Sequence, residues 1–144
     1  MSGTEELRPL VGLLDTSTVI LLPQLENPEL LPEEPLISTI TLAELSVGPL
    51  VARTPDERAA RQAHVQQAEA DFEPIPFDAA AARAFGQVAA SLRRRGRKTS
   101  ARAYDALIAA VAVANGMPLY TVSPDDFAGI AALDVVAVPH PGGG

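Results

Sequence analysis

Leu13-Leu14-Asp15-Thr16-Ser17 is the stretch around which the chain is organised. A short apolar run, Leu10–Leu14, ends on a carboxylate and two hydroxyl residues, which is typical of a strand buried on both faces. The two hydroxyl residues would then lead into a helix through Val19 to Leu22. An Asp at such a junction has two interpretations, a helix cap or a metal ligand. The role of Asp15 therefore depends on which other acids reach the same place.

Length and composition limit the class of protein. A chain of 144 residues that is 47% hydrophobic suits one domain, which we expect at residues 10–138 between flexible tails at 1–9 and 139–144. The absence of Cys excludes thiolate metal sites and fits a reducing compartment. No apolar run approaches the roughly 20 residues of a membrane helix, and no signal peptide is visible, so we expect a soluble, cytoplasmic protein that does not contact a membrane.

The net charge of -7 argues against broad electrostatic adhesion to nucleic acid. A polyanion could be handled only through a local basic patch or through bound cations.

Strand-like and helix-like segments alternate along the chain. Further strands are predicted at Leu36–Ile40, at Phe72–Phe77 as a short or edge strand, at Leu119–Val122 and at Val135–Val138. Helices are predicted at about 41–48, 55–71, 79–95 and 101–115, with Thr54 and Asp78 as caps of the second and third and Gly116 just past the end of the last. This alternation predicts an α/β fold in one domain, with a mostly parallel central sheet of about five strands and helices on both faces.

Four acids are predicted to lie at one edge of that sheet. Asp15 ends the first strand, Glu44 lies in the first turn after the second, and Asp126 follows a later strand. Ligands bind at the carboxyl edge of open parallel sheets because loops and helix N-termini converge there. Asp105 joins the other three if its helix begins at the same edge. Taken singly, each acid has a structural explanation, such as a capping box between Thr41 and Glu44, but the shared edge favours a site.

Four carboxylates in one cleft would repel one another unless cations lay among them. A hard cation with oxygen ligands, Mg²⁺ or Mn²⁺, is the natural partner. Such a site can polarise a phosphodiester, activate water and stabilise the leaving oxygen. The residues therefore predict metal-assisted phosphodiester hydrolysis. His64 and His140 are assigned no catalytic role.

The order of these motifs resembles a known family. The resemblance rests on Leu14-Asp15-Thr16-Ser17, Thr41-Leu42-Ala43-Glu44-Leu45, Asp105-Ala106-Leu107-Ile108-Ala109-Ala110 and the Thr121-x-Ser-x-Asp-Asp-Phe127 segment. These look like the successive motifs of PIN-domain ribonucleases, above all the VapC-type toxins of type II toxin-antitoxin pairs, over nearly all of residues 10–138. Position 123 is Ser where the family often carries Asn.

The resemblance implies a PIN-like fold and a Mg²⁺-dependent endoribonuclease that acts as a toxin. It also implies homodimerisation and inhibition by a cognate antitoxin protein. The implied acidic quartet, both catalytic and metal-binding, is Asp15, Glu44, Asp105 and Asp126. Asp126 is preferred to the neighbouring Asp125 because it precedes Phe127 as the motif requires.

Hydroxyl and basic side chains near the acids are candidates for contacting RNA. The run Arg93-Arg94-Arg95-Gly96-Arg97-Lys98 holds five of the chain's eleven cations, and it is either a solvated helix end or a phosphate-binding patch. The candidate substrate-binding residues are Ser17, Arg95, Arg97, Lys98, Arg102 and Thr121.

Two other classes of function share features with this sequence. A non-catalytic PIN-like module that binds RNA or a protein stays open as an alternative. A receiver domain or a phosphotransferase fits poorly, because no second acid stands beside Asp15 and Lys98 is the only lysine. Carboxylates and a metal contact phosphates, which carry no base information, so selectivity for an RNA sequence would come from the surrounding loops.

Overall fold

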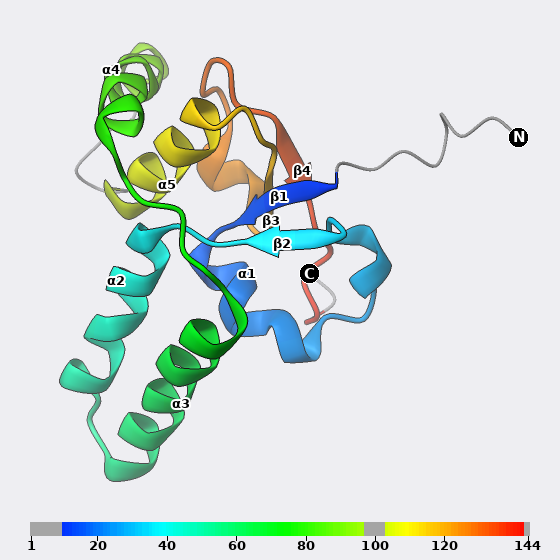
Figure 1. Ribbon diagram of the computed structural model, residues 1–144, viewed down its shortest axis with the longest axis vertical. Coiled ribbons are helices and arrows are strands. Elements are labelled where there is room, and N and C mark those ends of the chain that lie inside the picture. The colour runs from blue at the N-terminus through cyan, green and yellow to red at the C-terminus, as the bar shows by residue number, and fades with distance from the viewer. Residues whose placement is uncertain (1–9, 97–102, 143–144) are drawn as a thin grey trace, which may run out of the picture.

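A parallel sheet lies at the centre of the computed structural model, which describes residues 10–96 and 103–142 (Figure 1). The described part contains four strands in the order β2-β1-β3-β4. Their bounds are Val11–Leu14 for β1, Glu34–Leu36 for β2, Leu119–Thr121 for β3 and Val135–Ala137 for β4. Leu13 of β1 pairs with Leu36 on one side and Leu119 on the other, so β1 is central.

Helices cover both faces of this sheet, as predicted. Their bounds are Thr16–Leu21 for α1, Thr39–Val47 for α2, Pro55–Asp71 for α3, Ala79–Arg94 for α4 and Ala103–Ala114 for α5. Short 3-10 turns add Leu22–Gln24 (η1), Pro28–Leu30 (η2), Gly48–Val51 (η3) and Pro124–Phe127 (η5). In Figure 1, α4 and α5 lie above the strands and α1, α2 and α3 below them. Within residues 10–96 and 103–142, no helix has the length and apolar character needed to cross a bilayer.

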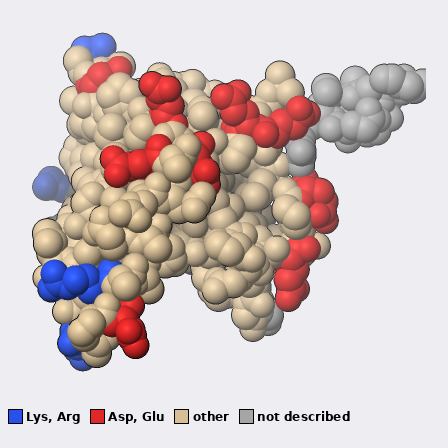
Figure 2. Space-filling view, turned by 60° about the horizontal axis from the view of Figure 1, so that its bottom comes forward, with Lys and Arg blue, Asp and Glu red and all other residues tan. Residues whose placement is uncertain are grey.

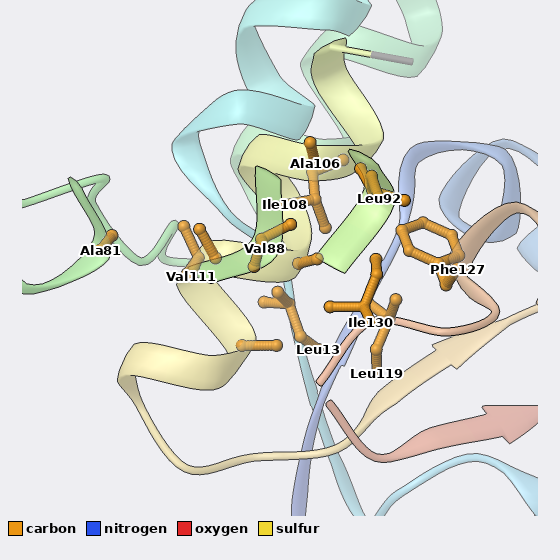
Figure 3. Close-up of a cluster of buried hydrophobic side chains, with 13 residues drawn as sticks. Leu13, Ala81, Val88, Leu92, Ala106, Ile108, Val111, Leu119, Phe127 and Ile130 are labelled. Carbon is orange, nitrogen blue, oxygen red and sulfur yellow. The ribbon is translucent and has the colours of Figure 1, made fainter. Parts of the chain in front are cut away.

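The side chains of β1 alternate between the two faces of the sheet and contribute to a separate core cluster on each face. Successive strand side chains point to opposite sides, so Leu13 and Leu14 enter different clusters. Leu13 packs with Val88 of α4 and with α5 in the cluster drawn in Figure 3. Leu14 packs with Val19 of α1 and with residues of α2 and α3. Both faces of β1 are therefore buried.

Local signals located two helix starts and one helix end correctly. The Thr54 hydroxyl accepts the backbone N–H of Glu57 at 3.0 Å, and Asp78 accepts that of Ala81 at 3.0 Å. Gly116 ends α5 with a φ of 63°, a left-handed conformation that favours glycine. These predictions are confirmed because a cap acts within a few residues of itself.

The predicted strand at Leu36–Ile40 is wrong beyond Leu36, its first residue, because β2 ends there. Within residues 37–40, only Ser38 takes part in a strand-type bridge, with Ile75, and the predicted strand at Phe72–Phe77 is reduced to the same bridge. The sheet therefore has four strands in the described residues instead of about five. Ser38, which is fully buried, starts α2 by accepting the N–H of Thr41 at 3.2 Å.

This earlier start also corrects the expected capping box. With Ser38 as the cap, Thr41 lies inside α2 and Glu44 falls in the second turn instead of the first. The Glu44 carboxylate is then too far along the helix to satisfy its first N–H groups. It can interact with another element instead.

Candidate functional site

Asp15 lies at the junction of β1 and α1 and is 3% exposed. Its Oδ1 accepts the backbone N–H of Thr18 at 3.3 Å and also the Thr18 hydroxyl. Its Oδ2 accepts the hydroxyls of Ser17, at 3.1 Å, and Thr121, at 2.9 Å. Asp15 is itself the cap, because its extended backbone directs the carboxylate toward the Thr18 N–H.

Two buried threonines connect Asp15 to the end of β3. The Thr18 hydroxyl accepts the N–H of Val122 at 3.1 Å, and the Thr121 hydroxyl accepts that of Ser123 at 2.9 Å. Each hydroxyl thus donates to Asp15 and accepts from the chain beyond β3. The sequence analysis missed Thr18, although a hydroxyl residue next to Val19 in an apolar helix was a visible signal.

Glu44 meets the same junction through Thr16. The Thr16 hydroxyl donates to Glu44 Oε1 at 2.6 Å and lies 3.1 Å from the hydroxyl of the buried Thr41. Thr16 follows Asp15 in the chain, so the two acids occupy adjacent positions at the carboxyl edge of the sheet. Long-range packing, which joins α1 to α2, creates this pair.

Asp105 and Asp126 lie on elements that border the same edge. The helix α5 leads into β3 and runs back against it, so the first turn of α5, which holds Asp105, lies where β1 and β3 end. Asp126 belongs to η5, which follows β3 and contacts α5. Both side chains are half-buried, whereas Asp125 is exposed. The buried Phe127 anchors η5 in the core.

The donor chemistry of this edge fits a hard cation. Its donors are carboxylate and hydroxyl oxygens, which Mg²⁺ prefers. Among residues 10–96 and 103–142, however, no three His, Asp or Glu side chains stand close enough together to hold one ion. Mg²⁺ usually keeps several water ligands and needs only one or two protein carboxylates, so the residues remain compatible with it.

The candidate substrate-binding residues have different surroundings. Ser17 and Thr121 both hydrogen-bond to Asp15. Arg95 lies against the backbone of Gly129, where a Cβ would stand 2.8 Å from its Nε. The other three, Arg97, Lys98 and Arg102, lie outside the described residues. Figure 2 shows acidic side chains spread over the face in view, with basic ones along its left side.

A pocket of about 290 Å³ opens beside Glu44, between α1, α2 and α3. Thr16 and Glu44 contribute to its wall, and Arg61 and His64 line it from α3. Sequence reasoning gave His64 no role because its helix is polar and its neighbours in the chain carry no motif. Only the packing of α3 against α1 and α2 places it near the acids.

Comparison with known proteins extends over almost the whole chain. Residues 13–133 match the PIN domain family, and this range includes all four acids. Ribonuclease VapC5 of Mycobacterium tuberculosis is 39% identical over 136 residues, which cover 90% of this chain and 97% of that protein. Ribonuclease VapC4 of the same organism is 34% identical over 102 residues, 71% of this chain and 75% of that protein.

Solved structures agree with the sequence matches. The crystal structure of VapBC-5 from Mycobacterium tuberculosis, a member of the VapBC family of toxin-antitoxin systems, matches with a TM-score of 0.78 and 39% identity, over 90% of this chain and 100% of that chain. DNA-bound VapBC from Salmonella typhimurium matches with a TM-score of 0.69 and 25% identity, over 90% and 98%. Fold, ordered acids and close relatives agree, and the chain therefore belongs to the PIN-domain family and, within it, to the VapC proteins.

Proposed function

We propose that this protein is a Mg²⁺-dependent endoribonuclease that hydrolyses RNA phosphodiester bonds and acts as the toxin of a toxin-antitoxin pair. The observation that carries the proposal is the buried Asp15 carboxylate at the end of β1, joined to Thr121 of β3 and, through Thr16, to Glu44. Sequence similarity supports RNA as the substrate, because two relatives above 30% identity are named ribonucleases. The metal is proposed from the oxygen-only donor set.

The acids would hold the cation, and the hydroxyls would orient the acids. Asp15, Glu44, Asp105 and Asp126 are the residues proposed to bind Mg²⁺, one or two of them directly and the others through the water ligands of the ion. When bound, the ion supplies charge that polarises the phosphodiester and activates water. Asp15 is held in one rotamer by three hydroxyls and a backbone N–H, so little reorganisation is needed to present it. Thr16 restrains Glu44 in the same way.

We propose that RNA approaches the site from the side where the half-buried Asp105 and Asp126 lie. Asp105 and Asp126 retain exposure that Asp15 lacks, so a phosphate would approach over them. The bound cation would offset the repulsion between phosphate and an acidic protein. The same bound cation would therefore serve both hydrolysis and RNA binding.

The partners follow from the solved relatives. The VapBC-5 structure is that of a member of the VapBC family of toxin-antitoxin systems, so we propose that a cognate antitoxin protein binds and inhibits this chain. We also propose a homodimer. Sedimentation of the purified protein, alone and with the product of a neighbouring small gene, tests both assemblies.

Cleavage of a single-stranded RNA by the purified protein tests the main proposal. We expect cleavage with Mg²⁺, none with EDTA, and recovery when Mg²⁺ or Mn²⁺ is restored. Asp105→Asn and Asp126→Asn should each lower the rate by at least about 100-fold, since each removes a charge proposed to bind metal. The matched control is Asp125→Asn, which changes the exposed neighbour and should leave the rate unchanged. Equal activity in Asp126→Asn and Asp125→Asn would contradict the assignment.

The alternative is a non-catalytic PIN-like module that binds RNA or protein. The absence of a three-acid cluster within residues 10–96 and 103–142 favours it. It requires RNA binding that EDTA leaves unchanged, with no cleavage under any divalent cation. Mapping of cleavage ends after brief expression, wild type against Asp105→Asn, separates the two functions in cells.

A further inference from the structure

The pocket beside Glu44 has the composition of a binding site for a flat, mostly neutral ligand. Its volume of about 290 Å³ approaches the lower end of the range typical of small-molecule sites. Ile20 of α1 and Leu45 of α2 supply apolar surface, while Thr16 and Glu44 supply polar atoms. A planar ring with polar edges would contact both kinds of surface. A nucleobase has this shape and chemistry.

Arg61 is held in a fixed orientation in the pocket wall. One Nη donates to the carbonyl oxygen of Gly48 at 3.0 Å, and the other pairs with Glu57 at 3.3 Å. Glu57 offsets much of the guanidinium charge, and Glu44 on the same pocket adds a negative charge. The wall therefore offers a planar group whose charge already has an acidic partner. These conditions favour stacking on a base over binding of a phosphate.

His64 is a second planar side chain in the same wall. It is half-buried, and within residues 10–96 and 103–142 nothing hydrogen-bonds to its imidazole. A ring without hydrogen-bond partners leaves its ring nitrogens available to a ligand, and the pocket is where part of the ring is accessible. The established role of aromatic and Arg planes in recognising unpaired RNA bases matches this pair.

We propose that this pocket binds one unpaired nucleobase of the RNA, next to the phosphodiester that is cut, and that His64 and Arg61 determine which base is accepted. The inference rests on the proposed ribonuclease function. The location follows from Thr16 and Glu44, which line the pocket and belong to the acidic site. A base seated there places its own phosphate near the acids. The base that the pocket accepts would then select the phosphodiester that is cut.

The two histidines of the chain allow a direct binding test without cleavage. In metal-free protein with EDTA, the proton resonances of the His64 imidazole should shift when one or more of the four nucleoside 5′-monophosphates is added. Inorganic phosphate at the same concentration should leave them in place. His140 is an internal control, since it is exposed and accepts the N–H of Gly142 at 3.0 Å. The spectrum of His64→Ala assigns the signals.

Cleavage kinetics give the second readout. His64→Ala should lower kcat/KM on single-stranded RNA by roughly 5-fold to 100-fold, the range expected for loss of one stacked base, with most of the change in KM. It should also broaden the base preference beside the cut. The matched control is Gln66→Ala, an exposed position on the same helix, which should change neither quantity.

The outcomes separate this inference from the proposed function. Cleavage by the wild type with His64 signals that no nucleotide moves would overturn the pocket assignment and leave the nuclease standing. Equal shifts with phosphate and nucleotides would reduce the pocket to an anion site and overturn it as well. A shift caused by an antitoxin peptide and by no nucleotide would reassign the pocket to the protein partner. A nucleotide shift in a protein that cuts no RNA would support base binding and reject the nuclease.

Discussion

Replacing Thr121 with Val tests whether the hydroxyl at the end of β3 stabilises Asp15. The substitution keeps the β-branched shape at a fully buried position and replaces only the hydroxyl with a methyl group. It deletes the 2.9 Å hydrogen bond to Asp15 Oδ2, and the N–H of Ser123 loses its acceptor. A hydrogen bond to a charged group contributes about 1.5 to 3 kcal/mol. Asp15 is 3% exposed, so water cannot replace the lost donor.

We therefore expect Thr121→Val to lower the free energy of unfolding by about 2 kcal/mol, which for a domain of this size lowers Tm by roughly 5 to 10 °C. Urea unfolding should show a lower midpoint with an unchanged slope. Thr121→Ser is the matched control because it keeps both hydrogen bonds and loses one methyl group, at a cost of about 1 kcal/mol. A Val variant as stable as the wild type, or a Ser variant less stable than the Val variant, would refute the role given to the hydroxyl.

Two further substitutions test how the sheet and α2 are built. Gly12→Ala should lower the free energy of unfolding by about 1 to 3 kcal/mol, because the added Cβ would stand 2.5 Å from Cε1 of the buried Tyr120. Gly86→Ala, in open space on α4, should raise the free energy of unfolding by about 0.5 to 1 kcal/mol. Thermal unfolding of both variants measures the contrast, and a change of the same sign in both would contradict the packing. Ser38→Ala should lower the free energy of unfolding, measured in urea, by about 1 kcal/mol, because α2 loses its cap. An unchanged urea midpoint would favour the start of this helix near residue 41 that was predicted from the sequence.

Helix limits were predictable where the signal and its effect lie close together in the chain. Thr54 and Asp78 each cap the helix that follows within three residues, and Gly116 ends α5 through its own backbone conformation. Such signals need no knowledge of the fold.

The region from Leu36 to Glu44 was not predictable in this way. Its β-branched residues favour a strand, and Thr41 with Glu44 has the spacing of a capping box. In the structure, Ser38 pairs with Ile75 in a single bridge and starts the helix. Long-range pairing decided between two local preferences of similar strength.

The sequence by itself determined the alternation of strands and helices, and with it the placement of the four acids on elements at the carboxyl edge of a parallel sheet. Periodicity and chain topology encode that arrangement locally. The tertiary structure decided what the acids contact. Thr121 reaches Asp15 across 106 positions, and Glu44 reaches Thr16 across 28, because strand register and helix packing bring them together. His64 enters the pocket beside Glu44 for the same reason, since no local pattern encodes a contact between distant helices.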